Sequence, residues 1–135
     1  MYANFKQYKP IDIFRTCIPA EDTSDNRFEE CNHKTGCVFL DLFVTHLTKY
    51  GLKSGRFHAS LLGITQTELF FTVQTLTGLS YTDFIHGYLE LMVRELIKKP
   101  EYDLKKISKR LGYHSYSGFY RFVSRNMKEK PSWLM

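Results

Sequence analysis

Apolar residues recur at helical spacing from residue 38 onward, and the pattern is clearest in residues 103–127. Asp103 can cap a short helix there, because its carboxylate accepts from the free N–H groups of an opening turn. Gly112 can end that helix in a left-handed conformation, and Ser115 can cap the next one. The apolar faces are then Leu104, Ile107 and Leu111, followed by Phe119, Phe122 and Val123. Two short helices joined by a glycine turn predict a helix-turn-helix unit.

The same outline occurs earlier in the chain, in residues 54–77. A helix over 38–50 precedes it and ends at Gly51, and Ser54 and Thr65 can cap two shorter helices over 54–63 and 65–77. The expected inner faces of these three helices are Phe39, Leu42, Phe43, His46, Leu47 and Tyr50; Phe57, Leu61 and Leu62; and Leu69, Val73 and Leu76. The repeated outline predicts two helix-turn-helix units in tandem.

A long helix over residues 80–99 connects the two units. Ser80 can open it, and Pro100 prevents it from continuing. It is apolar around much of its circumference, so we expect both units to pack against it. Gly87 inside it indicates the close approach of a neighbouring helix, and Pro131 can start a last short helix. The predicted fold is all-α, with tandem helix-turn-helix units, a long linker helix and about seven helices.

Residues 1–36 are poorly periodic and predict an irregular N-terminal arm, followed by one domain over 37–135. Apolar residues in the arm, Ile13 and Phe14 among them, indicate that it packs on the domain. Four potential metal ligands lie in or just after the arm: Cys17, Cys31, His33 and Cys37. Their spacing matches no common zinc module, so we predict no metal site and no cofactor.

The charge is distributed unevenly along the chain. The net charge is +5, yet residues 93–135 hold eleven basic and four acidic residues, which leaves −2 for the rest. A concentrated positive charge indicates a polyanionic partner, although a solvated helix face would have the same composition. No apolar run is long enough for a membrane span, and the N-terminus lacks a signal-peptide pattern. We therefore expect a cytoplasmic protein with reduced cysteines.

Residues 37–135 resemble the DNA-binding domain of AraC-type transcription regulators. The resemblance rests on A-x-x-L-G-I-T-x-x-x-L (59–69) and T-G-L-S-x-x-x-F (77–84) in and after the first unit. In the second unit it rests on I-S-x-x-L-G-Y-x-S-x-S-x-F-x-R (107–121), followed by Pro131. It implies two recognition helices placed in successive major-groove segments of double-stranded DNA. Only about 36 residues precede the match, so we expect a short form without a sensing domain.

The two units differ in how well they keep the family pattern. In the first unit, the base-facing positions fall on Thr67, Phe70 and Phe71, and the family's usual arginine and lysine fall on Phe71 and Gln74. Apolar side chains can contact a thymine methyl group but cannot make the bidentate contacts that select guanine. The second unit keeps Arg121. Its predicted DNA-contacting residues are Ser115, Tyr116, Ser117, Gly118, Tyr120, Arg121 and Arg125, with Lys105, Lys106, Lys109 and Arg110 on phosphates.

The sequence therefore predicts a DNA-binding transcription regulator that reads DNA mainly through its second recognition helix. The alternative is a helical protein-interaction module that has lost its first DNA-reading surface. In that case Phe70 and Phe71 would form an exposed aromatic pair for a protein partner or for self-association. We do not expect an enzyme, because the chain has no nucleophile elbow, phosphate loop or H-E-x-x-H motif, and its histidines are scattered.

Overall fold

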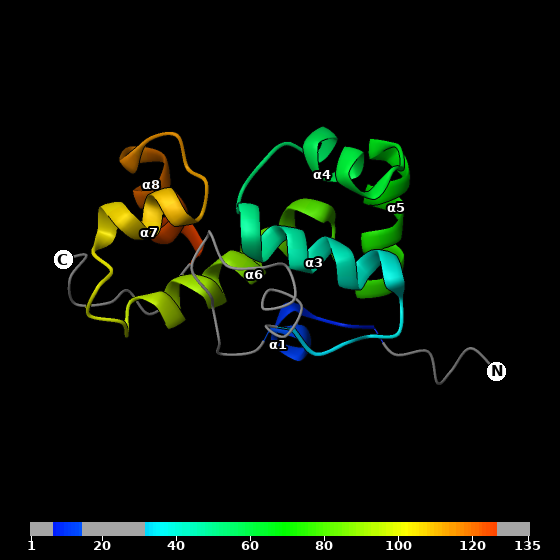
Figure 1. Cartoon of the computed structure of the whole chain (residues 1–135), viewed down its shortest axis with the longest axis horizontal. Coiled ribbons are helices and arrows are strands. Elements are labelled where there is room, and N and C mark those ends of the chain that lie inside the picture. The colour runs from blue at the N-terminus through cyan, green and yellow to red at the C-terminus, as the bar shows by residue number, and fades with distance from the viewer. Residues whose placement is uncertain (1–6, 15–31, 127–135) are drawn as a thin grey trace.

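The computed structural model describes residues 7–14 and 32–126, and within them it contains seven helices and no strand (Figure 1). The helices are α1 (Pro10–Ile13), α3 (Val38–Tyr50), α4 (Gly55–Leu62), α5 (Gln66–Thr77), α6 (Tyr81–Leu96), α7 (Leu104–Arg110) and α8 (Tyr116–Asn126). This confirms the all-α prediction. α1 was not predicted, and the helix expected at Pro131 lies outside the described residues.

Local capping explains where these helices begin. The predicted caps all accept a hydrogen bond from the backbone N–H three residues further on. The bonds join Phe57 to Ser54 (3.1 Å), Glu68 to Thr65 (3.1 Å), Asp83 to Ser80 (3.1 Å), Lys106 to Asp103 (2.8 Å) and Gly118 to Ser115 (3.2 Å). Glu68 in turn accepts from the Thr65 N–H at 2.9 Å, completing a capping box at the start of α5.

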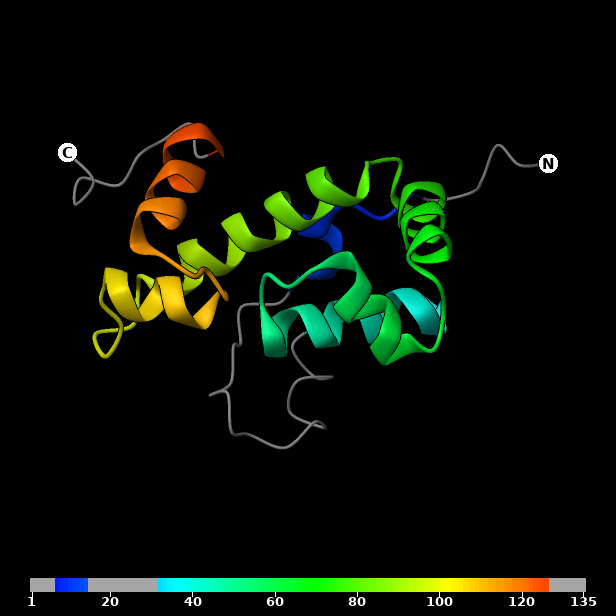
Figure 2. The same cartoon turned by 90° about the horizontal axis from the view of Figure 1, so that it is seen from above.

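The long helix α6 is the central element of the fold. Its buried residues share the core with the inner faces of the other helices. They are Phe84, Ile85, Tyr88, Leu89, Met92, Val93 and Leu96. One unit (α4 and α5) and the other (α7 and α8) lie towards opposite ends of α6, and both views show this arrangement (Figures 1 and 2). The expectation that α6 is the strut between the units is confirmed, because it packs against both α5 and α8.

The inner faces of α3 and α4 differ from those predicted. α3 buries Leu40 and Val44 beside Phe43 and Leu47, whereas Phe39 and Leu42 are exposed. The segment 38–44 is apolar at six of seven positions, so its periodicity does not select a face, and tertiary packing into the shared core decides it. In α4 the fully buried residues are His58 and Ala59, while Phe57 and Leu62 are half-buried and Leu61 is exposed.

The described part of the N-terminal arm docks on α5 and α6. The Tyr8 N–H donates to the Leu76 carbonyl at 3.0 Å, and Lys9 Nζ donates to the Thr77 carbonyl at 2.6 Å. Ile13 is fully buried in the core. Pro10 of α1 lies against Gly87 of α6, where an added Cβ atom would meet the Pro10 ring at 3.1 Å. The close neighbour expected at Gly87 is therefore the arm helix.

Candidate nucleic-acid interface

Helix α8 presents one polar face to solvent and buries the other. Phe119, Phe122 and Val123 are buried against the core. The exposed residues are Tyr116, Ser117, Tyr120, Arg121 and Arg125, together with Ser115 just before the helix, and Gly118 is half-buried. Tyr116 and Tyr120 expose 39% and 42% of their surface, so both are partly accessible to solvent. Hydroxyl, aromatic and guanidinium groups therefore share one accessible helix face.

Tyr113, in the turn before α8, fixes the position of this helix. Its ring packs against the rings of Phe119 and Phe122, with centroids 5.7 Å away in both cases. Burial raises the pKa of the Tyr113 phenol well above its usual value, so this group stays neutral. Helix α8 thus rests on an aromatic cluster on one side and is accessible to solvent on the other.

Basic side chains of α7 flank α8, with one exception. Lys105, Lys106 and Lys109 are exposed, as a phosphate-contacting role requires. Arg110 departs from the sequence expectation: it is only 3% exposed, and its Nη1 donates to the Lys49 carbonyl at 3.3 Å. A guanidinium group buried in this way cannot reach a phosphate. The sequence analysis predicted a phosphate contact for Arg110 because this residue follows three lysines in the same helix, and these lysines are exposed.

Helix α5 of the first unit exposes a different chemistry. Its exposed residues are Gln66, Thr67, Glu68, Phe70, Phe71, Gln74 and Thr75, none of which is basic. Phe71 exposes 70% of its surface, but Phe70 stacks on Tyr81 with the ring centroids 4.3 Å apart. The Phe70 ring also covers Gly55, where an added Cβ atom would be 2.7 Å from Phe70 Cε1. The two residues therefore do not form a free aromatic pair, and self-association through them is not supported.

A groove of about 580 Å³ lies where the two units meet. The first unit contributes Leu52, Lys53, Ser54 and Phe57 to its walls, and the second contributes Gly112, Tyr113 and His114. Lys53 and His114 are exposed and border the N-terminal ends of α4 and α8. Sequence reasoning did not assign them to the site, because no local pattern brings together residues about 60 positions apart.

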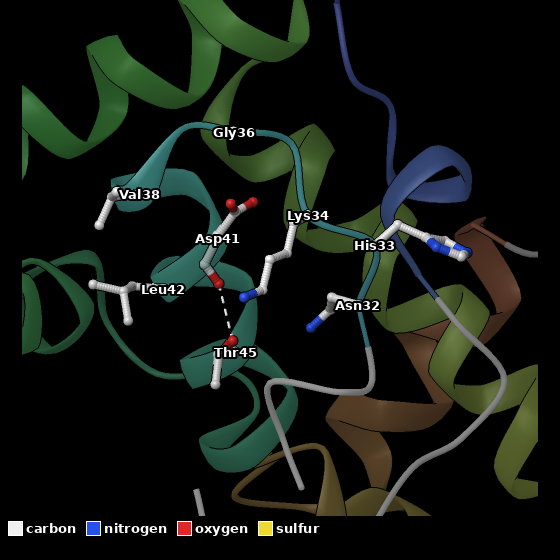
Figure 3. A pocket seen from close by; sticks show the side chains of 8 residues that line it. All are labelled: Asn32, His33, Lys34, Gly36, Val38, Asp41, Leu42 and Thr45. Atoms are coloured by element: carbon white, nitrogen blue, oxygen red, sulfur yellow. Dashed lines mark hydrogen bonds between the residues drawn. The ribbon is translucent and has the colours of Figure 1, made fainter. Parts of the chain in front are cut away.

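A second cavity, of about 320 Å³, lies between the arm and the start of α3 (Figure 3). Among the residues that the structure describes, those that line it lie between Asn32 and Thr45, and none of them belongs to α5 or α8. The Asp41 carboxylate in its wall accepts from both the N–H and the hydroxyl of Thr35, at 2.9 and 2.8 Å. His33 points away from the cavity (Figure 3).

The possible metal ligands of the arm are only partly described by the structure. His33 and Cys37 lie within the described residues, whereas Cys17 and Cys31 lie outside them. Within residues 7–14 and 32–126, no three His, Cys, Asp or Glu side chains are grouped as a metal site would need. None of the helices described here is long and apolar enough to cross a membrane.

Two helix-turn-helix units on a shared linker helix, with an exposed polar recognition helix and a basic flank, define a DNA-binding protein. A family model of the helix-turn-helix domain matches residues 58–134, which is more than half of the chain. The chain therefore belongs to the AraC-type helix-turn-helix family of DNA-binding transcription regulators, whose members are typically non-enzymatic. No curated protein and no solved structure matches it.

Proposed function

We propose that this regulator reads its operator mainly through α8, with α5 in a secondary role. The observation that carries the proposal is the contrast between the two outward faces. The face of α8 combines Arg121 and Arg125 with hydroxyl and phenol groups, whereas that of α5 has no cation. Guanidinium groups make the bidentate contacts that discriminate guanine, and Arg121 lies near the middle of its helix.

The side chains of the second unit take different roles in this proposal. Arg121 contacts a base edge, and Tyr116 and Ser117 add polar or methyl contacts near the start of the helix. The side chains that hold phosphates and set the salt dependence are Lys105, Lys106, Lys109 and Arg125. Arg110 is left out because it is buried. Lys53 and His114 are added, because the groove that they line lies between the two units, where the DNA backbone would cross.

The first unit contributes a weaker and different kind of selectivity. Thr67 and Phe71 are exposed on α5, and a methyl group or an aromatic ring can contact the C5-methyl group of thymine. Neither side chain can hydrogen-bond to both acceptors of guanine in the major groove. The proposal therefore implies a bipartite operator, with a specific half under α8 and a thymine-rich half under α5.

The test begins with the selection of duplexes from a random pool by the purified protein at physiological salt. With the recovered operator, Arg121→Ala is expected to weaken specific binding by about 1–3 kcal/mol, or roughly 5- to 150-fold, and to relax one base position. Lys109→Ala is expected to weaken binding equally on all sequences and to lower the salt slope by about one.

Lys34→Ala is the matched control for these variants. Lys34 is also an exposed lysine, but it lies beside the arm cavity rather than on a recognition unit (Figure 3). It is expected to leave affinity, specificity and salt slope unchanged. Wild-type affinity and specificity in Arg121→Ala would reject α8 as the main reader, and a failure to recover any operator would reject sequence-specific binding.

A further inference from the structure

The two units touch each other directly, in addition to their connection through α6. The contact joins the loop after α3 to the turn between α7 and α8. The Leu52 N–H donates to the Leu111 carbonyl at 2.5 Å, across 59 residues of chain. Leu111 is itself fully buried. A short backbone hydrogen bond of this kind requires the two chain segments to meet without side chains between them.

Two glycines make this approach possible. A Cβ atom on Gly51 would collide with the Leu111 carbonyl oxygen, and one on Gly112 would lie 2.7 Å from the Leu52 carbonyl oxygen. Both contacts are to backbone atoms, which cannot move aside as the end of a side chain can. Both glycines also have positive φ, +75° and +86°. Each segment thus has a glycine where the other segment comes closest.

Arg110 adds a charged contact at the same place. Its Nη1 donates to the carbonyl of Lys49, which lies in the last turn of α3. The partial negative charge at the end of α3 favours a cation there. Arg110 belongs to the second unit, whereas α3 packs against α4 and α5 of the first. The buried guanidinium therefore bridges the two units.

His58 supports the contact from inside the first unit. Its Nε2 lies 3.2 Å from the Gly51 carbonyl oxygen, and its ring packs edge-on against Phe43. Burial lowers the pKa of His58, so the ring is neutral and its Nε2–H donates to this carbonyl. The loop at Gly51 is thus held by α4 on one side and by the second unit on the other.

We propose that Arg110 is a positioning residue, which acts with the Gly51–Leu52 and Leu111–Gly112 backbones as an inter-unit clasp. One helix alone, α6, would let the units bend and twist relative to each other. A second connection away from the α6 axis removes that freedom, so α5 and α8 meet DNA at one separation and one angle. The inference rests on the proposed function in one respect only, namely that both helices face DNA.

The first experiment needs no DNA and measures amide hydrogen exchange by NMR. In the wild type the Leu52 N–H is expected to exchange slowly, at a rate near that of core amides such as Tyr88. In Arg110→Met, the exchange rate of the Leu52 amide is expected to rise by about tenfold or more relative to that of the Tyr88 amide. The comparison with Tyr88 corrects for any change in global stability. Lys109→Met is the matched control, because its exposed neighbouring side chain takes no part in the clasp, and it is expected to keep the wild-type ratio.

The second experiment uses the selected operator with one, two or three base pairs inserted between its halves. Each insertion rotates one half by about a tenth of a turn relative to the other. The wild type and Lys109→Met are expected to lose about fivefold or more in affinity at one insertion, whereas Arg110→Met loses less than about twofold. Lys109→Met is expected to lower affinity at every spacing, because it removes a phosphate contact. Arg110→Met is expected to change how affinity depends on the spacing.

The outcomes separate the two proposals. Unchanged Leu52 exchange in Arg110→Met, or the same spacing dependence as in the wild type, would overturn the clasp. Failure to select an operator would overturn the proposed function and leave the exchange result standing. If Arg110→Met does not fold, Arg110→Lys serves instead. It keeps a cation but loses the planar guanidinium, and accelerated Leu52 exchange is again the expected result.

Discussion

Replacing Gly112 with alanine should cost far more stability than the same change at Gly63, although both glycines follow the first helix of a unit. Their φ angles are similar, +86° and +71°. An alanine in the left-handed region costs about 1–2 kcal/mol at either position. Alanine also has less conformational entropy in the unfolded chain, which returns about 0.4–1 kcal/mol in both variants. These two contributions cancel when the variants are compared.

The difference between the variants comes from the space around each glycine. A Cβ atom on Gly63 has no neighbour within 4 Å. A Cβ atom on Gly112 lies 2.7 Å from the Leu52 carbonyl oxygen and 2.9 Å from the Leu52 nitrogen, so one backbone segment has to move. Such overpacking typically costs about 1–3 kcal/mol. We therefore expect Gly112→Ala to lower the free energy of unfolding by about 1–3 kcal/mol more than Gly63→Ala does.

Urea unfolding followed by circular dichroism measures both variants against the wild type. The transition midpoint is expected to fall in each variant without a change in slope, because neither substitution alters the surface exposed on unfolding. The midpoint of Gly112→Ala should be clearly the lower one. Equal losses, within about 0.5 kcal/mol, would show that the contact between Gly112 and Leu52 is not close in solution, and the reasoning would be refuted.

Two further predictions follow from buried side chains. Because burial lowers the pKa of His58 from 6.5, the unfolded state binds more protons than the folded one just below that pH. The free energy of unfolding should therefore fall as the pH drops below about 6.5. Urea titrations between about pH 5 and 7.5 measure this dependence, and His58→Gln is expected to flatten it. The same pH dependence in the variant and the wild type would contradict a lowered pKa of His58. Phe70→Ser should destabilise the fold by about 1–2 kcal/mol through loss of the stack on Tyr81, whereas Phe71→Ser, 70% exposed, should stay within about 0.5 kcal/mol. Thermal unfolding of the two variants compares them directly, and equal losses would mean that Phe70 is not anchored.

Ambiguous periodicity explains where the sequence failed to place side chains. In α8 the apolar residues are few and regularly spaced, so the buried face of Phe119, Phe122 and Val123 could be read from the sequence. In α3 nearly every residue of the first two turns is apolar, and several faces satisfy the helical period equally well. Leu40 and Val44 are buried there, in place of the expected Phe39 and Leu42, because their side of α3 faces the core shared with the other helices.

The sequence by itself determined the helices from α3 to α8, their order and the tandem arrangement, because these follow from interactions within a few residues. Ser54, Thr65, Asp103 and Ser115 cap helices through bonds to N–H groups three residues away, so a local pattern is sufficient to reveal them. The exposed face of α8 follows in the same way from its period.

Only the tertiary structure decided which charged and aromatic side chains remain available to a ligand. Arg110 and Lys109 are neighbours with the same kind of charge, yet one is buried against the end of α3 and the other is exposed. Phe70 and Phe71 differ in the same way, since only Phe70 meets Tyr81. Lys53 and His114 share one groove from units far apart in the chain. In each case the outcome depends on contacts between distant segments, and such contacts exist only once the helices have packed.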